Sequence, residues 1–200
     1  MTTVGTGEFT YEAILDWAKL PLGETFDTVS AVATDSQDRV YAFQRKDPPV
    51  MIFDRDGNLL DSWGNGNFEF SHGIHIADDI IYVTDRNSSV CIMYTLEGRP
   101  IQMLGRHGVH SDTGCENPGD LCPRAAGPFN YPSEMVPSPS GDLYVSDGYR
   151  NARIHRFTAD GQLKASWGQP GKTEPGHFHL PHSILVDDDS TVFVCDRENH

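Results

Sequence analysis

Short apolar stretches separated by turn residues recur along the chain at a regular spacing. Three such stretches align with one another: "DRVYAFQRKDPPVMIFDRDGNLLDSWG", "DIIYVTDRNSSVCIMYTLEGRPIQMLG" and "GDLYVSDGYRNARIHRFTADGQLKASWG". A fourth copy begins as "STVFVCDRENH" and runs to His200. Each copy predicts several short strands, because brief apolar runs rich in Val, Ile, Tyr and Phe between turn residues are typical of strands.

The turns inside these copies favour tight hairpins. A tight hairpin needs residues that tolerate positive φ, and Gly after an acidic residue meets that need. Such pairs lie between apolar stretches at Asp56-Gly57, Glu97-Gly98 and Asp160-Gly161. A four-stranded unit that recurs about every 40 residues indicates a blade of a β-propeller. The sequence therefore predicts an all-β protein, and its units resemble NHL-type repeats.

The repeats divide the chain into about four blades. Residues 1–22 form an N-terminal segment, and the blades cover approximately 23–64, 65–105, 127–168 and 169–200, with an insertion at 106–126. The last blade is incomplete. An open propeller leaves unpaired faces that invite aggregation. We therefore expect these blades to be the front part of a six-bladed propeller.

Two histidines occupy equivalent places in alternate blades. When the blades are aligned on Asp85, Asp147 and Asp196, the turn into the innermost strand contains His72 in the second blade and His182 in the fourth. Serine takes this place in the first and third blades. Innermost strands line the central channel. A third histidine in a sixth blade would complete the three-imidazole arrangement of a catalytic zinc site. The alternative is that both histidines fill the channel by hydrogen bonding.

Composition narrows the possible partners. The net charge of −14 argues against nucleic acid and anionic membranes, because both require a basic surface. We see neither a signal peptide nor an apolar run long enough to span a membrane, so a cytoplasmic location is expected. Most of the four cysteines are then expected to be reduced. Cys115 and Cys122, in the insertion, leave three alternatives: a solvated loop that borders the channel mouth, a disulfide, or a metal site.

Three segments resemble the peptidyl-α-hydroxyglycine α-amidating lyase family, and above all its single-domain bacterial members. The segments are "FSHGIHIADDIIYVTD", "VSDGYRNARIHRF" and "LPHSILVDDDSTVFVCDREN". The resemblance implies a six-bladed propeller with zinc held at its axis by three histidines. It also implies cleavage of a small peptide-like, hydroxyglycine-type substrate to an amide and glyoxylate.

The resemblance assigns roles to individual residues. His72 and His182 match two zinc ligands, and the third would lie beyond His200. Tyr149 matches the catalytic tyrosine, Arg45 an active-site arginine, and Arg197 an arginine that faces the substrate. The backbone carbonyls of Val32 and Ile74 match ligands of a structural calcium ion. "FSHG" lacks the proline that usually precedes the ligand, and Lys46-Asp47-Pro48 follows Arg45 where glycine is common. These departures leave the shape of two loops open.

Two other classes of function fit the repeats. One is a non-catalytic NHL-type propeller that binds a protein or peptide, and the other is a propeller hydrolase such as a lactonase. With two of three histidines in register, the 200 residues are expected to bind zinc weakly and to be nearly inactive. Arg86, after the strand-end Asp85, is interpreted as a surface ion pair of small energetic value. His177 and His179 are interpreted as loop residues, and Trp63 and Trp167 as core.

Overall fold

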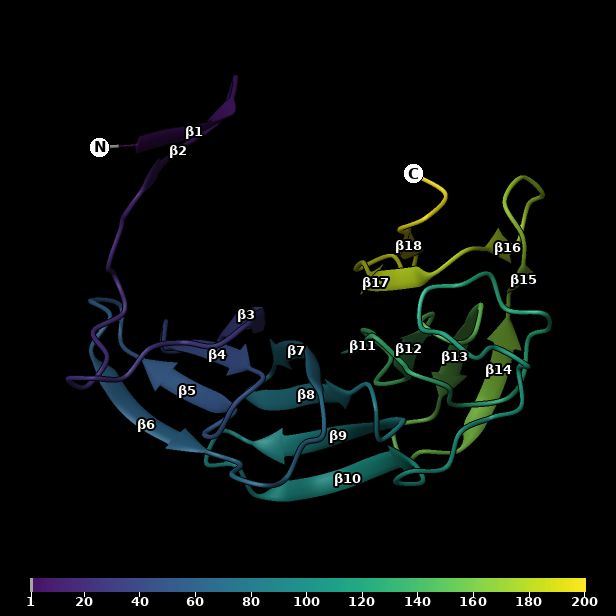
Figure 1. The fold of residues 1–200 in the computed structure, drawn as a ribbon, viewed down its shortest axis with the longest axis horizontal. Helices are drawn as coiled ribbons and strands as arrows, with labels where there is room; N and C mark the ends of the chain where they lie inside the picture. The colour runs from purple at the N-terminus through teal and green to yellow at the C-terminus, as the bar shows by residue number, and fades with distance from the viewer. Residues whose placement is uncertain (1) are drawn as a thin grey trace.

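The fold of this protein, taken from a computed structural model, is an open arc of β-sheets (Figure 1). The structure describes residues 2–200, and these contain strands and turns but no α-helix. Within this range no helix has the length and apolar character needed to cross a bilayer. The predicted all-β class and the four-stranded repeats are confirmed.

Three complete blades follow one another along the arc, each with its strands in sequence order and antiparallel. The first contains β3 (Val29–Thr34), β4 (Val40–Gln44), β5 (Val50–Phe53) and β6 (Leu59–Trp63). The second contains β7 (Ser71–Ala77), β8 (Ile80–Asp85), β9 (Val90–Thr95) and β10 (Pro100–Gly105). The third contains β11 (Glu134–Pro137), β12 (Leu143–Asp147), β13 (Arg153–Phe157) and β14 (Leu163–Trp167).

The remaining strands lie at the two ends of the chain. The fourth sheet has two strands, β17 (Pro181–Val186) and β18 (Val192–Asp196), and is the incomplete blade. It is preceded by the short parallel pair β15 (Gln169–Pro170) and β16 (His177–Phe178). A separate hairpin, β1 (Thr2–Thr6) and β2 (Phe9–Ala13), stands away from the arc (Figure 1).

The hairpin glycines have the predicted conformation. Gly57, Gly98 and Gly161 have φ of 80°, 76° and 86°, and they join the third and fourth strands of the three complete blades. These values lie in the left-handed region, which glycine enters without steric cost.

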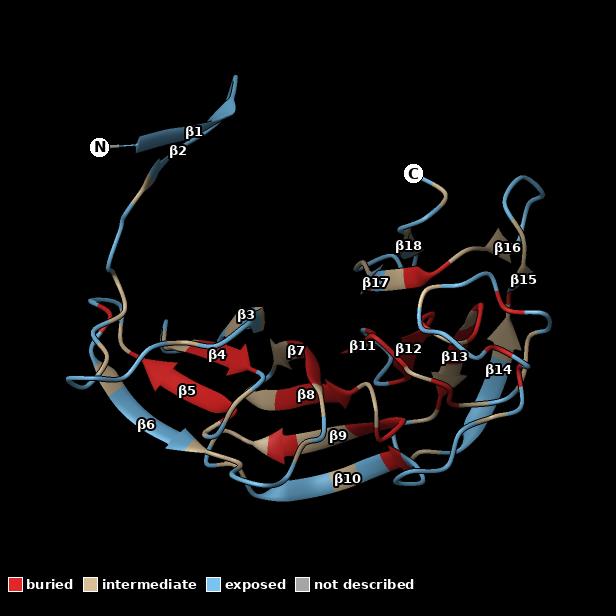
Figure 2. Cartoon of the chain, viewed as in Figure 1, coloured by how far each residue is buried: buried red, intermediate tan, exposed pale blue. Residues whose placement is uncertain are grey.

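Apolar cores lie between successive blades. Tyr41 and Phe43 of the first blade pack with Ile81 and Val83 of the second, and all four are fully buried. Similar clusters join the second blade to the third and the third to the fourth. Trp63 and Trp167 pack at the edges of these clusters, as core residues would. In Figure 2 buried residues follow the middle strands, whereas β6 and β10 are largely exposed.

The two ends of the arc present apolar side chains to solvent. Val32 on β3 is 63% exposed, and Leu185 and Phe193 on the last sheet are 56% and 53% exposed. These faces have no neighbouring blade among the described residues.

The same hydrogen-bonding arrangement recurs in every blade, at the residue that ends its second strand. The carboxylate of Asp85 accepts hydrogen bonds from the backbone N–H groups of Glu69 and Phe70. Asp147 and Asp196 hold the equivalent backbone segments at Asn130 and His179 in the same way. In the first blade Gln44 takes this place and accepts from Asp27. The aligned aspartates therefore clamp the segment that leads into the innermost strand, where His72 and His182 occur.

Candidate active site

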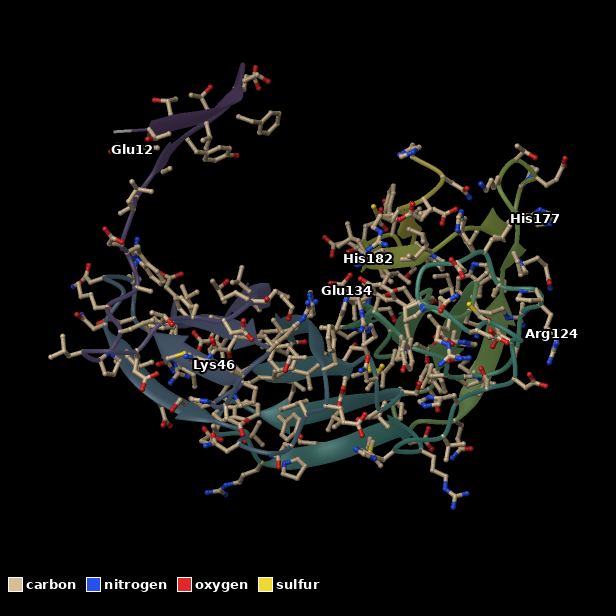
Figure 3. All side chains as sticks on the ribbon, viewed as in Figure 1. Glu12, Lys46, Arg124, Glu134, His177 and His182 are labelled. Atoms are coloured by element: carbon tan, nitrogen blue, oxygen red, sulfur yellow. The ribbon has the colours of Figure 1, made fainter. Side chains whose placement is uncertain are left out.

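His72 and His182 lie close together on the inner side of the arc. Each occupies a β-bulge: the register of β7 with β8 shifts between Ser71 and Gly73, and that of β17 with β18 shifts between Pro181 and Ser183. A bulge turns a side chain away from the regular alternation of a strand. The two imidazole centroids are 5.0 Å apart. Figure 3 shows His182 at the inner edge of the arc.

The hydroxyl of Tyr149 is the point on which the site converges. Its oxygen lies 3.0 Å from His72 Nε2 and 3.1 Å from His182 Nε2. Arg197 Nη1 donates a hydrogen bond to the same oxygen at 3.2 Å. These side chains come from three sheets, since His72 belongs to the second blade, Tyr149 follows β12 of the third, and the other two belong to the fourth. The site therefore depends on how the blades pack together.

Local contacts set the state of the two imidazoles. The ring nitrogen Nδ1 of His72 donates to the Ser133 carbonyl oxygen at 2.8 Å, which leaves Nε2 as the lone-pair nitrogen facing Tyr149. Burial lowers the pKa of His72 to about 4, and the neighbouring His182 contributes. Burial also lowers the pKa of His182, with a smaller contribution from the charge of Arg197. Both rings are therefore neutral near pH 7, as metal ligands must be.

Gly148 brings the third and fourth blades into direct contact beside this cluster. A Cβ atom at this position would lie 2.2 Å from the backbone oxygen of Pro181. Only glycine permits this approach without displacing backbone. The approach places Tyr149 next to His182.

Curated proteins resemble the chain over most of its length. It is 30% identical over 210 residues to NHL repeat-containing protein 3 of Homo sapiens, covering 97% of this chain and 56% of that protein. It is 30% identical over 230 residues to peptidyl-glycine alpha-amidating monooxygenase of Mus musculus, covering 96% of this chain and 22% of that protein. It is 32% identical over 154 residues to a probable peptidyl-alpha-hydroxyglycine alpha-amidating lyase of Caenorhabditis elegans, covering 75% and 41%.

The chain belongs to the NHL-repeat propeller family that includes the amidating lyases. It spans about half the length, or less, of these curated relatives. No family model matches it. A streptogramin B lyase structure shares the fold with a TM-score of 0.60 at 13% identity, covering 85% of this chain and 48% of that one. A Staphylococcus aureus virginiamycin B lyase shares it with a TM-score of 0.57 at 15% identity, covering 84% and 48%.

The donor set of this NHL-repeat chain fits part of the zinc site that the resemblance implies. Two neutral imidazole nitrogens converge on one small region, and the Ser133 carbonyl orients one of them, as second-shell groups orient zinc-bound histidine. A catalytic zinc commonly has three protein ligands. Among residues 2–200 no group of three or more His, Cys, Asp or Glu side chains is placed to hold a metal. The described residues thus contain two of the three histidines that the resemblance implies, and their role as ligands stays a prediction.

Of the other predicted site residues, Arg45 lies near this cluster, and its charge contributes to the lowered pKa of His72. The Arg45 guanidinium lies over the ring of Phe70, 4.0 Å from its centroid. Val32 and Ile74 belong to β3 and β7, the innermost strands of the first two blades, and no described feature tests their role as calcium ligands. His179 Nε2 lies 3.2 Å from the Gly119 carbonyl oxygen of the insertion, as a loop residue would.

Arg86 was wrongly interpreted as a surface ion pair. Its guanidinium is half-buried over aromatic rings, 3.7 Å from the centroid of Phe70 and 4.7 Å from that of Tyr149. No ion pair to a carboxylate joins it among residues 2–200. One sequence signal could have identified it: Arg45, Arg86 and Arg197 each follow directly the aligned residue that ends the second strand.

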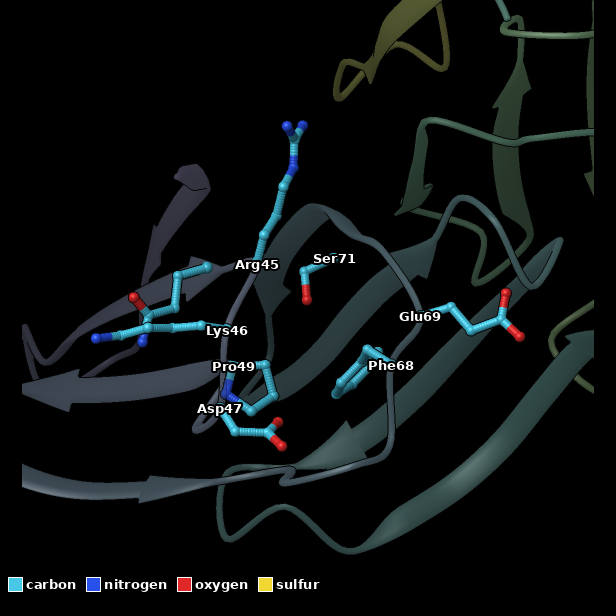
Figure 4. Close-up of a pocket in the computed structure, with 8 residues that line it drawn as sticks. Arg45, Lys46, Asp47, Pro49, Phe68, Glu69 and Ser71 are labelled. Atoms are coloured by element: carbon cyan, nitrogen blue, oxygen red, sulfur yellow. The ribbon is translucent and has the colours of Figure 1, made fainter. Parts of the chain in front are cut away.

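A polar pocket of about 280 Å³ lies beside Arg45, between the first and second blades (Figure 4). Its other lining residues include Lys46, Asp47, Phe68 and Glu69. The Arg45 side chain extends away from Lys46 and Asp47 in this view. The pocket is large enough for a small polar group of a ligand.

The insertion packs against the segment that carries Tyr149. Gly119 N–H donates to the Tyr149 carbonyl oxygen at 2.6 Å, and the Cys115 carbonyl oxygen accepts from Arg150. Cys115 and Cys122 are buried free thiols that pack together with Ala152. The insertion therefore borders the site and is largely exposed, with its two thiols buried.

Proposed function

We propose that the site around Tyr149 cleaves the C–N bond of an α-hydroxyglycine-type substrate, releasing an amide and glyoxylate. The observation that supports this best is the convergence of two neutral imidazoles and one guanidinium on the Tyr149 hydroxyl. The named amidating-lyase relatives point to the same class of reaction.

The reaction needs one proton removed and one delivered. The substrate hydroxyl loses its proton, the oxygen lone pair forms the carbonyl of glyoxylate, the C–N bond breaks, and the amide nitrogen takes a proton. Tyr149, as its phenolate, would accept the hydroxyl proton and return it to the departing nitrogen. Arg197, 3.2 Å from the phenolic oxygen, would stabilise the phenolate and bind the carboxylate that becomes part of glyoxylate.

Zinc would be held by His72 and His182 together with a ligand outside the described residues. When bound, it would supply Lewis-acid polarisation of the substrate's hydroxyl oxygen. The Ser133 carbonyl would hold the His72 ring in its metal-binding orientation. A structural calcium on the carbonyls of Val32 and Ile74 belongs to the same proposal.

Glyoxylate release from N-benzoyl-α-hydroxyglycine tests the proposal directly. With saturating zinc, we expect only slow release above the buffer rate, because the third ligand lies outside the described residues. Tyr149→Phe should lower this release toward the buffer rate, since a general base usually contributes about 10²–10⁴-fold. Tyr11→Phe, at a 60% exposed position in the separate hairpin, is the matched control and should retain the full rate. Equal release by Tyr149→Phe and the unsubstituted protein would overturn the assignment.

A zinc titration followed by calorimetry tests the ligands separately from turnover. We expect weak binding by the 200 residues. His72→Ala or His182→Ala should weaken it by a further tenfold or more, because even the loss of a group that only orients a ligand costs about 10–100-fold. His177→Ala, in the short strand β16, should bind as the unsubstituted protein does. Tight stoichiometric zinc would contradict the expected weak binding, and equal binding by all three variants would contradict the ligand assignment.

A second candidate is a propeller that binds a protein or peptide without reacting with it. The observation in its favour is the similarity to NHL repeat-containing protein 3 across 97% of the chain. Saturable peptide binding with no glyoxylate release from any hydroxyglycine substrate would favour this candidate.

A further inference from the structure

Three arginines occupy the same place in three blades. Arg45, Arg86 and Arg197 each follow the residue that ends the second strand. The backbone N–H of each donates to a carbonyl oxygen of the segment entering its blade, at Thr28, Phe70 and Leu180 respectively. In the third blade this place is taken by Gly148, whose lack of a side chain admits Pro181. The repeat therefore places three guanidinium groups at the same end of the sheets. In the third blade, Tyr149 follows the glycine that takes this position.

Aromatic rings hold two of these cations near each other. The guanidiniums of Arg45 and Arg86 lie 4.0 Å and 3.7 Å from the centroid of the same Phe70 ring. Arg86 also lies over the rings of Tyr149 and Tyr131. Cation–π contact fixes the planes of the guanidiniums but does not neutralise their charge.

Carboxylate partners for this pair are absent from the described residues. Neither Arg45 nor Arg86 forms an ion pair within residues 2–200, whereas Arg197 pairs with Glu198 at 2.9 Å. Burial lowers the pKa of Arg86 from its usual value, the nearby Tyr149 hydroxyl opposes this shift, and the like charge of Arg45 adds to it. Two adjacent cations without a carboxylate partner among residues 2–200, in a chain of net charge −14, form a local site for an anion.

We propose that Arg45 and Arg86 bind a second anionic group of the ligand, so that the site takes a dicarboxylate. The identification of the ligand as a substrate rests on the proposed function, in which Arg197 binds the carboxylate of the hydroxyglycine unit. One guanidinium fork suffices for one carboxylate. Arg45 and Arg86, which both lie over Phe70, therefore remain to bind an anionic group at the other end of the ligand. This end would lie next to the pocket beside Arg45. Arg86 is the residue that sets this specificity.

Binding of glutarate and butyrate, compared by calorimetry at low salt, tests this without any reaction. We expect glutarate to bind about tenfold or more tightly than butyrate, since the second carboxylate adds a charge-assisted contact. Arg86→Met keeps the apolar contact with Phe70 without the charge, and it should reduce the ratio to about two or less. Arg86→Lys, which keeps the charge but not the planar fork, should give an intermediate ratio.

Arg55→Met is the matched control. Arg55 is 79% exposed and pairs with Asp38 on the first blade, so its loss should leave the ratio as it was. The same ratio in the unsubstituted protein, Arg86→Met and Arg86→Lys would overturn the proposal and give Arg86 a packing role only. An equal affinity of the unsubstituted protein for the two ligands would overturn it as well.

The outcome is separable from that of the proposed lyase activity. An Arg86-dependent preference for glutarate, together with equal glyoxylate release by Tyr149→Phe and the unsubstituted protein, supports the anion site and removes the lyase assignment. Glyoxylate release that depends on Tyr149, without any preference for the dicarboxylate, supports the lyase assignment and removes the anion site.

Discussion

Replacing Asp147 by alanine should remove one of the fully buried strand-end clamps. Its carboxylate is fully buried and accepts hydrogen bonds from Asn130 N–H at 3.0 Å and from Asn151 Nδ2 at 2.8 Å. His155 Nε2 lies 3.2 Å from the same carboxylate, and the other ring nitrogen of His155 contacts Ser166 Oγ at 2.7 Å. The substitution therefore leaves buried polar groups without their acceptor.

The expected loss follows from these contacts. A hydrogen bond to a charged group contributes about 1.5–3 kcal/mol, and a buried donor left unpaired costs about 1–3 kcal/mol. Because neighbouring losses are not additive, we expect Asp147→Ala to lower the free energy of unfolding by about 3–5 kcal/mol. That is a large share of the roughly 5–15 kcal/mol available to a domain.

Urea unfolding followed by circular dichroism measures the effect. Asp196→Ala should cost less, about 1–2 kcal/mol, because this clamp is only partly buried and solvent can replace the carboxylate. Asp189→Ala, at an exposed turn of the same blade, should change stability by less than about 0.5 kcal/mol. If Asp147→Ala and Asp189→Ala unfold at the same urea concentration, the clamp has no role in stability.

Three further predictions concern other positions. Gly148→Ala should separate β12 from β17 and destabilise the protein by about 1–3 kcal/mol, the usual cost of overpacking. Thermal unfolding measures this loss, with Gly127→Ala as the control because a Cβ there meets no atom within 4 Å. Met135→Ala, in the core between the second and third blades, should cost about 2–5 kcal/mol, whereas a loss below 1 kcal/mol in urea would contradict its burial. Burial raises the pKa of Asp35, but hydrogen bonds from Arg39 outweigh this and hold that pKa below the usual 3.8. The ionised carboxylate therefore stabilises the fold above its unfolded-state pKa, and this stabilisation is lost as pH falls through the folded-state pKa. Asp35→Asn should lower the melting temperature at pH 7 and lower it by a smaller amount at pH 3. An equal loss at both pH values would refute this reasoning.

The fold could be predicted from the sequence because each blade repeats its own signals. The glycine after an acidic residue marked the hairpins, and the aligned aspartates marked the ends of the second strands. The same alignment indicated that His72 and His182 are equivalent positions, and the structure brings their rings to 5.0 Å. The blade repeat shows which residues are equivalent in different blades. Equivalent residues occupy matching positions around the channel.

The contacts of Arg86 could not be predicted from spacing alone. An Asp-Arg pair at a strand end suggests a local ion pair, but the carboxylate of Asp85 is occupied by backbone N–H groups and by Ser88. The guanidinium therefore turns to the rings of Phe70 and Tyr149, which come from different blades. Contacts between blades depend on rotamers and on close approaches such as that of Gly148, and neither leaves a periodic trace in the sequence.

The position of the Tyr149 cluster at the meeting of three blades ties its integrity to their docking. Hydrogen bonds within one sheet can persist while the interface between two sheets loosens, because local openings cost less than global unfolding. A slight rotation of the fourth sheet would carry His182 and Arg197 away from the tyrosine with no strand melted. Gentle warming or dilute denaturant should then separate the side chains of the cluster and abolish its function. This should happen well before circular dichroism registers any loss of β-structure.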